Sequence, residues 1–80
     1  MKQMRLSELS PGQRGTVTAL LAQGAPRRRL RDLGLTEGCR VTALGRSPFG
    51  DPTAYEIRGA VIALRESESS RVLIRRGGEP

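Results

Sequence analysis

The chain has 80 residues, so we expect one domain with a small core, because a chain this short buries only about 60 to 65% of its unfolded surface. No histidine is present and Cys39 is the only cysteine, which excludes an intrachain disulfide and disfavours a zinc or iron site of the usual ligands. The formal net charge of +6 fits equally an acidic partner surface, whether protein, nucleic acid or lipid headgroup, and a basic surface that is simply solvated.

Short apolar alternations follow one another along the chain and predict a mainly β domain. Leu6 and Leu9, three residues apart, predict a short helical turn over residues 4–9. Alternating residues then predict a strand over 15–22, and Pro26, which suits the first helical position, predicts a helix over 26–33. Four more strands are expected over 39–46, 55–58, 60–64 and 72–74, with a possible polar turn over 66–70.

The end of the expected helix has a defined pattern. Leu30 and Leu33 share one helix face, and Gly34 supplies the left-handed residue that closes a helix. If Gly34 is the residue just past the cap, Leu35 packs back on Leu30 and fixes the direction in which the chain leaves.

Five short strands with mostly hairpin links and one short helix after the first strand predict a small closed five-stranded barrel, since closure removes exposed sheet edges. We expect this domain to occupy residues 1–75 and a disordered tail to occupy 76–80. The expected core consists of Leu6, Val17, Leu30, Leu33, Leu35, Val41, Ile57, Ile62, Leu64, Val72 and Ile74.

The candidate partner-binding residues are arginines and one aromatic residue. Arg27, Arg28 and Arg29 fall at the expected helix start, where the macrodipole disfavours cations, so an acidic partner would explain them. Arg31 belongs to the same basic stretch. The alternative is that these side chains extend into water, where salt screens the dipole.

Three other positions have two interpretations each. Phe49, in the Pro48–Pro52 loop, could anchor a partner or fold down as a lid over the barrel end, and we favour the lid. Cys39 beside Arg40 could have a lowered pKa, but a small buried apolar role is commoner. Asp51 and Glu56 are five residues apart, and surface charge explains them better than a catalytic pair.

The ordered series of motifs resembles one family. Residues 29–38 (RLRDLGLTEG), Val41, residues 48–52 (PFGDP), residues 57–59 (IRG) and residues 62–65 (IALR) resemble the FeoA family of bacterial ferrous iron transport proteins. The likeness runs from Leu6 to Ile74. Two positions depart from the pattern: Phe49 replaces a frequent Leu, and Ser69 replaces a common Ala, which suggests that position 69 is less buried here.

This resemblance implies an SH3-like barrel that acts in the cytoplasm beside FeoB, a membrane permease with a GTPase part. Independently of the resemblance, the absence of histidine and the single cysteine lead us to expect no catalytic residue, no cofactor and no metal ligand in this chain. The same module is similar to the C-terminal SH3-like domain of repressors of the diphtheria-toxin-repressor type.

Two other functions compete with the FeoB accessory role. The chain could modulate a metal-dependent regulator, or it could bind nucleic acid, although base stacking would have only Tyr55 and Phe49 to use. An enzyme is disfavoured because the sequence has no phosphate-binding Gly-rich motif and no nucleophile paired with a base. No apolar run approaches the ~20 residues of a membrane span, and no signal-peptide pattern is present, which favours the cytoplasm.

Overall fold

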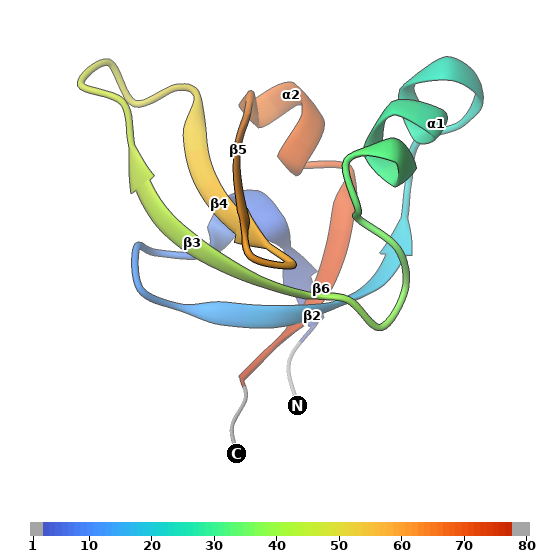
Figure 1. The fold of residues 1–80 in the computed structure, drawn as a ribbon, viewed down its shortest axis with the longest axis horizontal. Coiled ribbons are helices and arrows are strands. Elements are labelled where there is room, and N and C mark those ends of the chain that lie inside the picture. The colour runs from blue at the N-terminus through green and yellow to red at the C-terminus, as the bar shows by residue number, and fades with distance from the viewer. Residues whose placement is uncertain (1–2, 78–80) are drawn as a thin grey trace.

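Six antiparallel strands form one sheet in the computed structural model, which describes residues 3–77 (Figure 1). The strands are β1 (Gln3–Arg5), β2 (Arg14–Leu20), β3 (Arg40–Arg46), β4 (Thr53–Ile57), β5 (Ala60–Leu64) and β6 (Val72–Arg76). The helices are a 3-10 helix η1 (Leu6–Glu8), α1 (Gly24–Asp32) and α2 (Glu66–Ser69). The expected mainly β class is confirmed, but the count of five strands is wrong, because β1 is too short for its alternation to be visible in the sequence.

The sheet curls around a single core, with strand order β1-β6-β2-β3-β4-β5 (Figure 1). Two register shifts interrupt the ladders, between Val17 and Ala19 in β2 and between Ala43 and Gly45 in β3, and such bulges increase strand bending. Among residues 3–77, β1 pairs only with β6 and β5 only with β4. The barrel is therefore not closed by a hydrogen-bonded seam in the described part of the chain.

The core contains most of the residues expected from the sequence. Leu33 and Ile62 are the exceptions, since they are half-buried and pack against the core from outside. Cys39 is buried, in agreement with its apolar interpretation. The expectation for Ser69 is wrong: it is 2% exposed, because α2 turns this residue inward. The buried apolar residues are Leu6, Leu9, Val17, Ala22, Leu30, Leu35, Cys39, Val41, Ala43, Tyr55, Ile57, Leu64, Val72 and Ile74.

Helix α1 starts two residues earlier than predicted. Gln23 has extended backbone angles, and the helix begins at Gly24, so Pro26 is the third helical residue. A proline fits there as well as at the first position, because the first turn of a helix has backbone N–H groups without intrahelical partners.

The end of α1 forms the predicted cap. The backbone N–H of Leu35 donates to the carbonyl of Leu30 at 3.0 Å, and that of Gly34 donates to the carbonyl of Arg31 at 2.9 Å. These two bonds define a Schellman motif, and Gly34 has a φ of +102°. Leu30 and Leu35 are both buried in the core, so the cap fixes the path from α1 to β3.

Near the C-terminus, β6 reaches Arg76, and the N–H of Gly77 donates to the carbonyl of Arg14 at 3.1 Å. The rest of the expected tail, residues 78–80, lies outside the described residues. No helix between residues 3 and 77 has the length and apolar composition that a membrane crossing requires.

Candidate functional site

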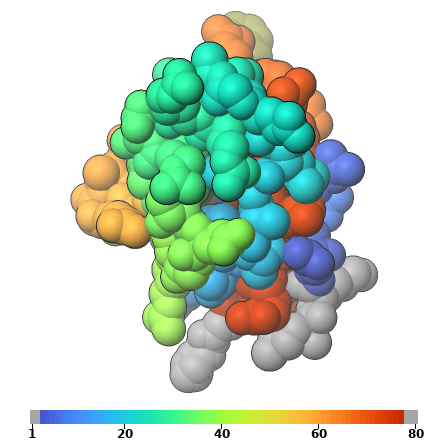
Figure 2. Space-filling model, turned by 90° about the vertical axis from the view of Figure 1, so that its right-hand side faces the viewer, coloured from blue at the N-terminus to red at the C-terminus, as the bar shows by residue number. Residues whose placement is uncertain are grey.

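Helix α1 presents three arginines around one shallow recess. Arg27, Arg28 and Arg31, together with Gly24, line a depression of about 370 Å³ on the outer side of the helix. Arg28 and Arg31 are exposed, whereas Arg27 is half-buried and its guanidinium donates to the carbonyl of Leu20 at 3.3 Å. Figure 2 shows this side of the molecule, where α1 forms the upper part of the surface. We call Arg27, Arg28 and Arg31 the α1 arginine face.

The prediction that Arg27, Arg28 and Arg29 all lie at the unfavourable start of the helix is wrong. Because α1 begins at Gly24, Arg27 is its fourth residue, and Arg29 and Arg31 lie in its last turn. Cations in the last turn are stabilised by the negative end of the dipole. The case for a partner at this face therefore depends on exposure and charge, and the dipole adds nothing to it.

Arg29 points to a different neighbour. Its Nε lies 2.6 Å from Oε2 of Glu68 on α2, and Oε1 of Glu68 accepts the backbone N–H of Arg65 at 3.0 Å. Partial burial by itself raises the pKa of Glu68, but the hydrogen bonds from Arg29 and Arg65 outweigh it, so this pKa lies below its ordinary value. Arg29 is thus a contact between helices, apart from the α1 arginine face.

A more apolar groove of about 520 Å³ separates α1 from α2. Ala22, Ala25, Pro26 and Leu30 supply its apolar wall, and the Arg29–Glu68 pair lies at its rim. Helix α1 therefore has arginines on one side and an apolar groove on the other.

Phe49 does not act as a lid. Its side chain is 94% exposed, because the loop from Ser47 to Pro52 is held by its own hydrogen bonds. Gly50 N–H donates to the Ser47 carbonyl at 2.8 Å, and the Ser47 hydroxyl donates to the Asp51 carbonyl at 2.8 Å. The loop and α1 lie at opposite ends of the upper side in Figure 1. The structure thus does not bring Phe49 together with the arginines.

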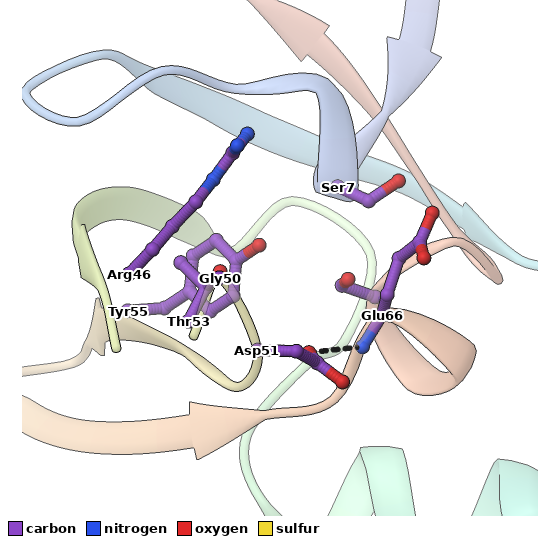
Figure 3. Close-up of a pocket in the computed structure, with 8 residues that line it drawn as sticks. Ser7, Arg46, Gly50, Asp51, Thr53, Tyr55 and Glu66 are labelled. Carbon is purple, nitrogen blue, oxygen red and sulfur yellow. Dashed lines mark hydrogen bonds between the residues drawn. The ribbon is translucent and has the colours of Figure 1, made fainter. Parts of the chain in front are cut away.

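A polar pocket of about 240 Å³ that no sequence pattern predicts lies beside the Phe49 loop (Figure 3). Its lining comes from η1, the end of β3, the β3–β4 loop, β4 and α2, and no local pattern links such distant segments. Oδ1 of Asp51 accepts the backbone N–H of Glu66 at 2.9 Å, which joins the loop to α2. Asp51 and Glu56 are both exposed, as expected, but the carboxylate that shares the pocket with Asp51 is that of Glu66. The lining residues are Ser7, Arg46, Gly50, Asp51, Thr53, Tyr55, Glu66 and Ser69.

No group of three or more His, Cys, Asp or Glu side chains that could hold a metal ion occurs within residues 3–77. The buried thiol of Cys39 donates to the carbonyl of its neighbour Arg40 at 3.4 Å.

Comparison with known proteins identifies a family. The model of the FeoA domain matches residues 4–76. The Fe(2+) transport protein A/Fe(2+) transporter FeoB fusion protein of Porphyromonas gingivalis is 29% identical over 69 residues. Those residues are 86% of this chain but only 8% of the fusion protein.

Solved structures of FeoA proteins have the same fold. The FeoA protein of Chlorobium tepidum is 38% identical with a TM-score of 0.85, covering 95% of this chain and 74% of that one. Stenotrophomonas maltophilia FeoA, complexed with zinc and described as an SH3 domain protein, is 34% identical with a TM-score of 0.79. The match covers 90% of this chain and 89% of that one. The six-stranded sheet is therefore an SH3-like fold.

Proposed function

This chain belongs to the FeoA domain family. We propose that it is a non-enzymatic accessory protein of ferrous iron uptake and that it binds a FeoB-type permease. The observation that carries the proposal is the Porphyromonas gingivalis relative, in which Fe(2+) transport protein A and the FeoB transporter are one polypeptide. Fusing two modules gives each a high effective concentration near the other, which is an advantage when the two act together. We infer that the separate chain achieves the same association through its own surface.

The α1 arginine face is the surface we propose for this contact. Arg28 and Arg31 are exposed beside Arg27 on one rigid helix whose end is fixed by the Schellman cap. A cluster of like charges on a rigid element attracts an acidic surface and raises the association rate. We therefore propose that the cytoplasmic part of the permease offers an acidic patch to α1.

Phe49 is proposed as a second, separate contact. An aromatic side chain that is 94% exposed on a hydrogen-bonded turn is suited to entering an apolar pocket of a partner. Because the loop and α1 lie at opposite ends of the same side (Figure 1), a partner that uses both must span that side.

The burial of the second aromatic residue, Tyr55, argues against the nucleic-acid alternative. Tyr55 is 1% exposed and belongs to the core, so Phe49 is the one aromatic ring available for stacking. Proteins that bind single strands without sequence preference usually stack successive bases on several aromatic side chains.

Complementation tests the proposed function. In a strain that lacks its own FeoA but retains FeoB, this chain and the matching permease should together restore ferrous iron uptake, and tagged chain should co-purify with that permease. A folded chain that neither restores uptake nor co-purifies would contradict the proposal. The isolated chain should show no GTP hydrolysis above a buffer control.

A further inference from the structure

The polar pocket beside the Phe49 loop contains buried hydroxyl groups without a protein partner. Tyr55 is 1% exposed, Ser69 is 2% exposed and Thr53 is 9% exposed. All three line the pocket, and none of their hydroxyl groups takes part in the side-chain hydrogen bonds found within residues 3–77. The Tyr55 hydroxyl points into the pocket (Figure 3). Buried polar groups are normally paired with protein or ordered water, so unpaired hydroxyls that line one space indicate that a polar group occupies it.

The charges around this space indicate the sign of the ligand. Asp51 and Glu66 contribute two carboxylates and Arg46 one guanidinium, so the lining has a formal charge of −1 in a protein of +6. Between residues 3 and 77, Arg46 forms no ion pair with either carboxylate, since the Arg29–Glu68 pair is the one salt bridge there. The carboxylates of Asp51 and Glu66 therefore have no ion-pair partner within the pocket.

We propose that this pocket receives the guanidinium group of an arginine side chain from a docking partner. Guanidinium has five N–H donors in one plane and accepts nothing, so it needs a surrounding of oxygen acceptors. Carboxylate oxygens of Asp51 and Glu66 and the hydroxyl oxygens of Tyr55, Thr53 and Ser69 form such a surrounding. A volume of about 240 Å³ is below the roughly 300 to 1,000 Å³ of sites for drug-sized ligands and suits one long side chain.

The neighbourhood of the pocket suits an anchored side chain of a protein. Gly50 and Asp51 belong both to the pocket wall and to the loop that exposes Phe49. A partner segment that inserts an arginine beside Gly50 would thus come near Phe49, the preceding residue, whose exposed ring can supply an apolar contact. The choice of a FeoB-type partner rests on the proposed function. The ligand of the pocket, in contrast, is tested without that partner.

Titration of ¹⁵N-labelled protein with N-acetyl-arginine amide, followed by NMR, tests the ligand directly. We expect saturable shifts of the amides of Gly50, Thr53, Glu66 and Ser69, with a dissociation constant on the order of 10 mM or below, because one side chain carries only part of an interface. N-acetyl-citrulline amide has nearly the same shape without the charge and should bind at least about tenfold more weakly.

Two charge variants complete the test. The double variant Asp51→Asn and Glu66→Gln should no longer show the amide shifts with N-acetyl-arginine amide. The asparagine retains the oxygen that accepts the N–H of residue 66, so the loop stays joined to α2. The matched control, Asp32→Asn with Glu37→Gln, removes the same charge outside the pocket and should bind arginine amide as wild type does. The proposal would be overturned by equal shifts from the citrulline analogue or by unchanged binding of arginine amide by the pocket variant. It would also be overturned if Mn²⁺ broadened the pocket resonances while arginine amide caused no shifts.

A binding assay with FeoB separates this inference from the proposed function. The pocket variant should bind the permease at least about tenfold more weakly than the control variant, corresponding to loss of a buried charged contact. If wild type binds arginine amide in the pocket but does not bind FeoB, the proposed function fails and the assignment of the ligand stands. Equal FeoB binding by the pocket variant and the control variant would show that the permease does not use the pocket.

Discussion

Arg29 of α1 and Glu68 of α2 form an ion pair with a distance of 2.6 Å between Nε and Oε2, and this pair joins the two α-helices. Glu68 uses its other carboxylate oxygen to accept the N–H of Arg65 at the start of α2. One carboxylate therefore both caps its own helix and holds the neighbouring helix, at the rim of the apolar groove.

Replacing Glu68 by Gln should lower the free energy of unfolding by about 0.2 to 1 kcal/mol at pH 7, because the Arg29 side chain is 58% exposed and water screens the pair. The pKa of Glu68 is lowered in the folded state, so its charge stabilises the fold above the ordinary value of 4.5. That stabilisation disappears as the pH falls through the lowered pKa. Urea titrations at pH 7 and pH 3 should thus show a difference between wild type and variant that shrinks with acid. A difference that grows at pH 3 would refute the stabilising role of the Glu68 charge. Glu37→Gln, which lies outside both helices, is the control.

Replacing Gly34 by Ala should destabilise the domain by about 1 to 3 kcal/mol, because a residue with a Cβ is strained at a φ of +102°. The added Cβ would also lie 3.3 Å from Cγ2 of Ile57. Gly45→Ala is the matched control, since a Cβ at Gly45 meets no atom within 4 Å and φ is not in the left-handed region. Thermal or urea unfolding measures both variants, and equal stability of the two would remove the cap as a determinant of the fold.

Replacing Leu35 by Ala should cost about 2 to 5 kcal/mol, because this side chain is fully buried and its removal leaves a cavity. Leu33→Ala should cost clearly less, since Leu33 is half-buried at the edge of the core. Chemical unfolding of the two variants in parallel gives the comparison. A larger loss for Leu33→Ala would contradict the observed packing.

Replacing Phe49 by Ala should change the free energy of unfolding by less than about 0.5 kcal/mol, because the ring is 94% exposed and supports nothing in its own chain. Binding to FeoB should nevertheless weaken if the ring enters a pocket of the partner. The result that would count against this contact is a folded Phe49→Ala variant with unchanged affinity.

Patterns that are local in the sequence predicted much of the fold. Alternation placed the five strands β2 to β6, and the spacing of Leu30, Gly34 and Leu35 predicted the cap, which two backbone hydrogen bonds form in the structure. The three-residue strand β1 was missed because its pairing with β6 joins Gln3 to Arg75, a relationship that no short window contains. The start of α1 was misplaced because Pro26 fits any position of the first turn.

The candidate sites were less predictable, because they depend on which segments the fold brings together. Arg29 was grouped with its sequence neighbours, but its side chain meets Glu68, 39 residues away. Phe49 was expected to fold down, but hydrogen bonds within its own turn hold it outward. Tyr55 and Ser69 line a pocket with Asp51 only after β4, α2 and the loop have come together.

Association of this chain with detergent-solubilised FeoB, followed by biolayer interferometry at low and high salt, tests the proposed contact through the α1 arginine face. The double variant Arg28→Glu and Arg31→Glu changes the two exposed residues of the α1 arginine face and leaves the Arg29–Glu68 pair intact. Arg75→Glu with Arg76→Glu makes the same charge change at the end of β6 and is the matched control.

Wild type and the β6 variant should associate with FeoB at similar rates that fall as salt rises. The α1 variant should associate at least about tenfold more slowly at low salt and depend less on salt, since clustered charges act mainly on the association rate. Circular dichroism melts should show all three proteins folded. Equal association of the α1 variant and the β6 variant would contradict a contact through the α1 arginine face, and no association of folded wild type would contradict binding to FeoB.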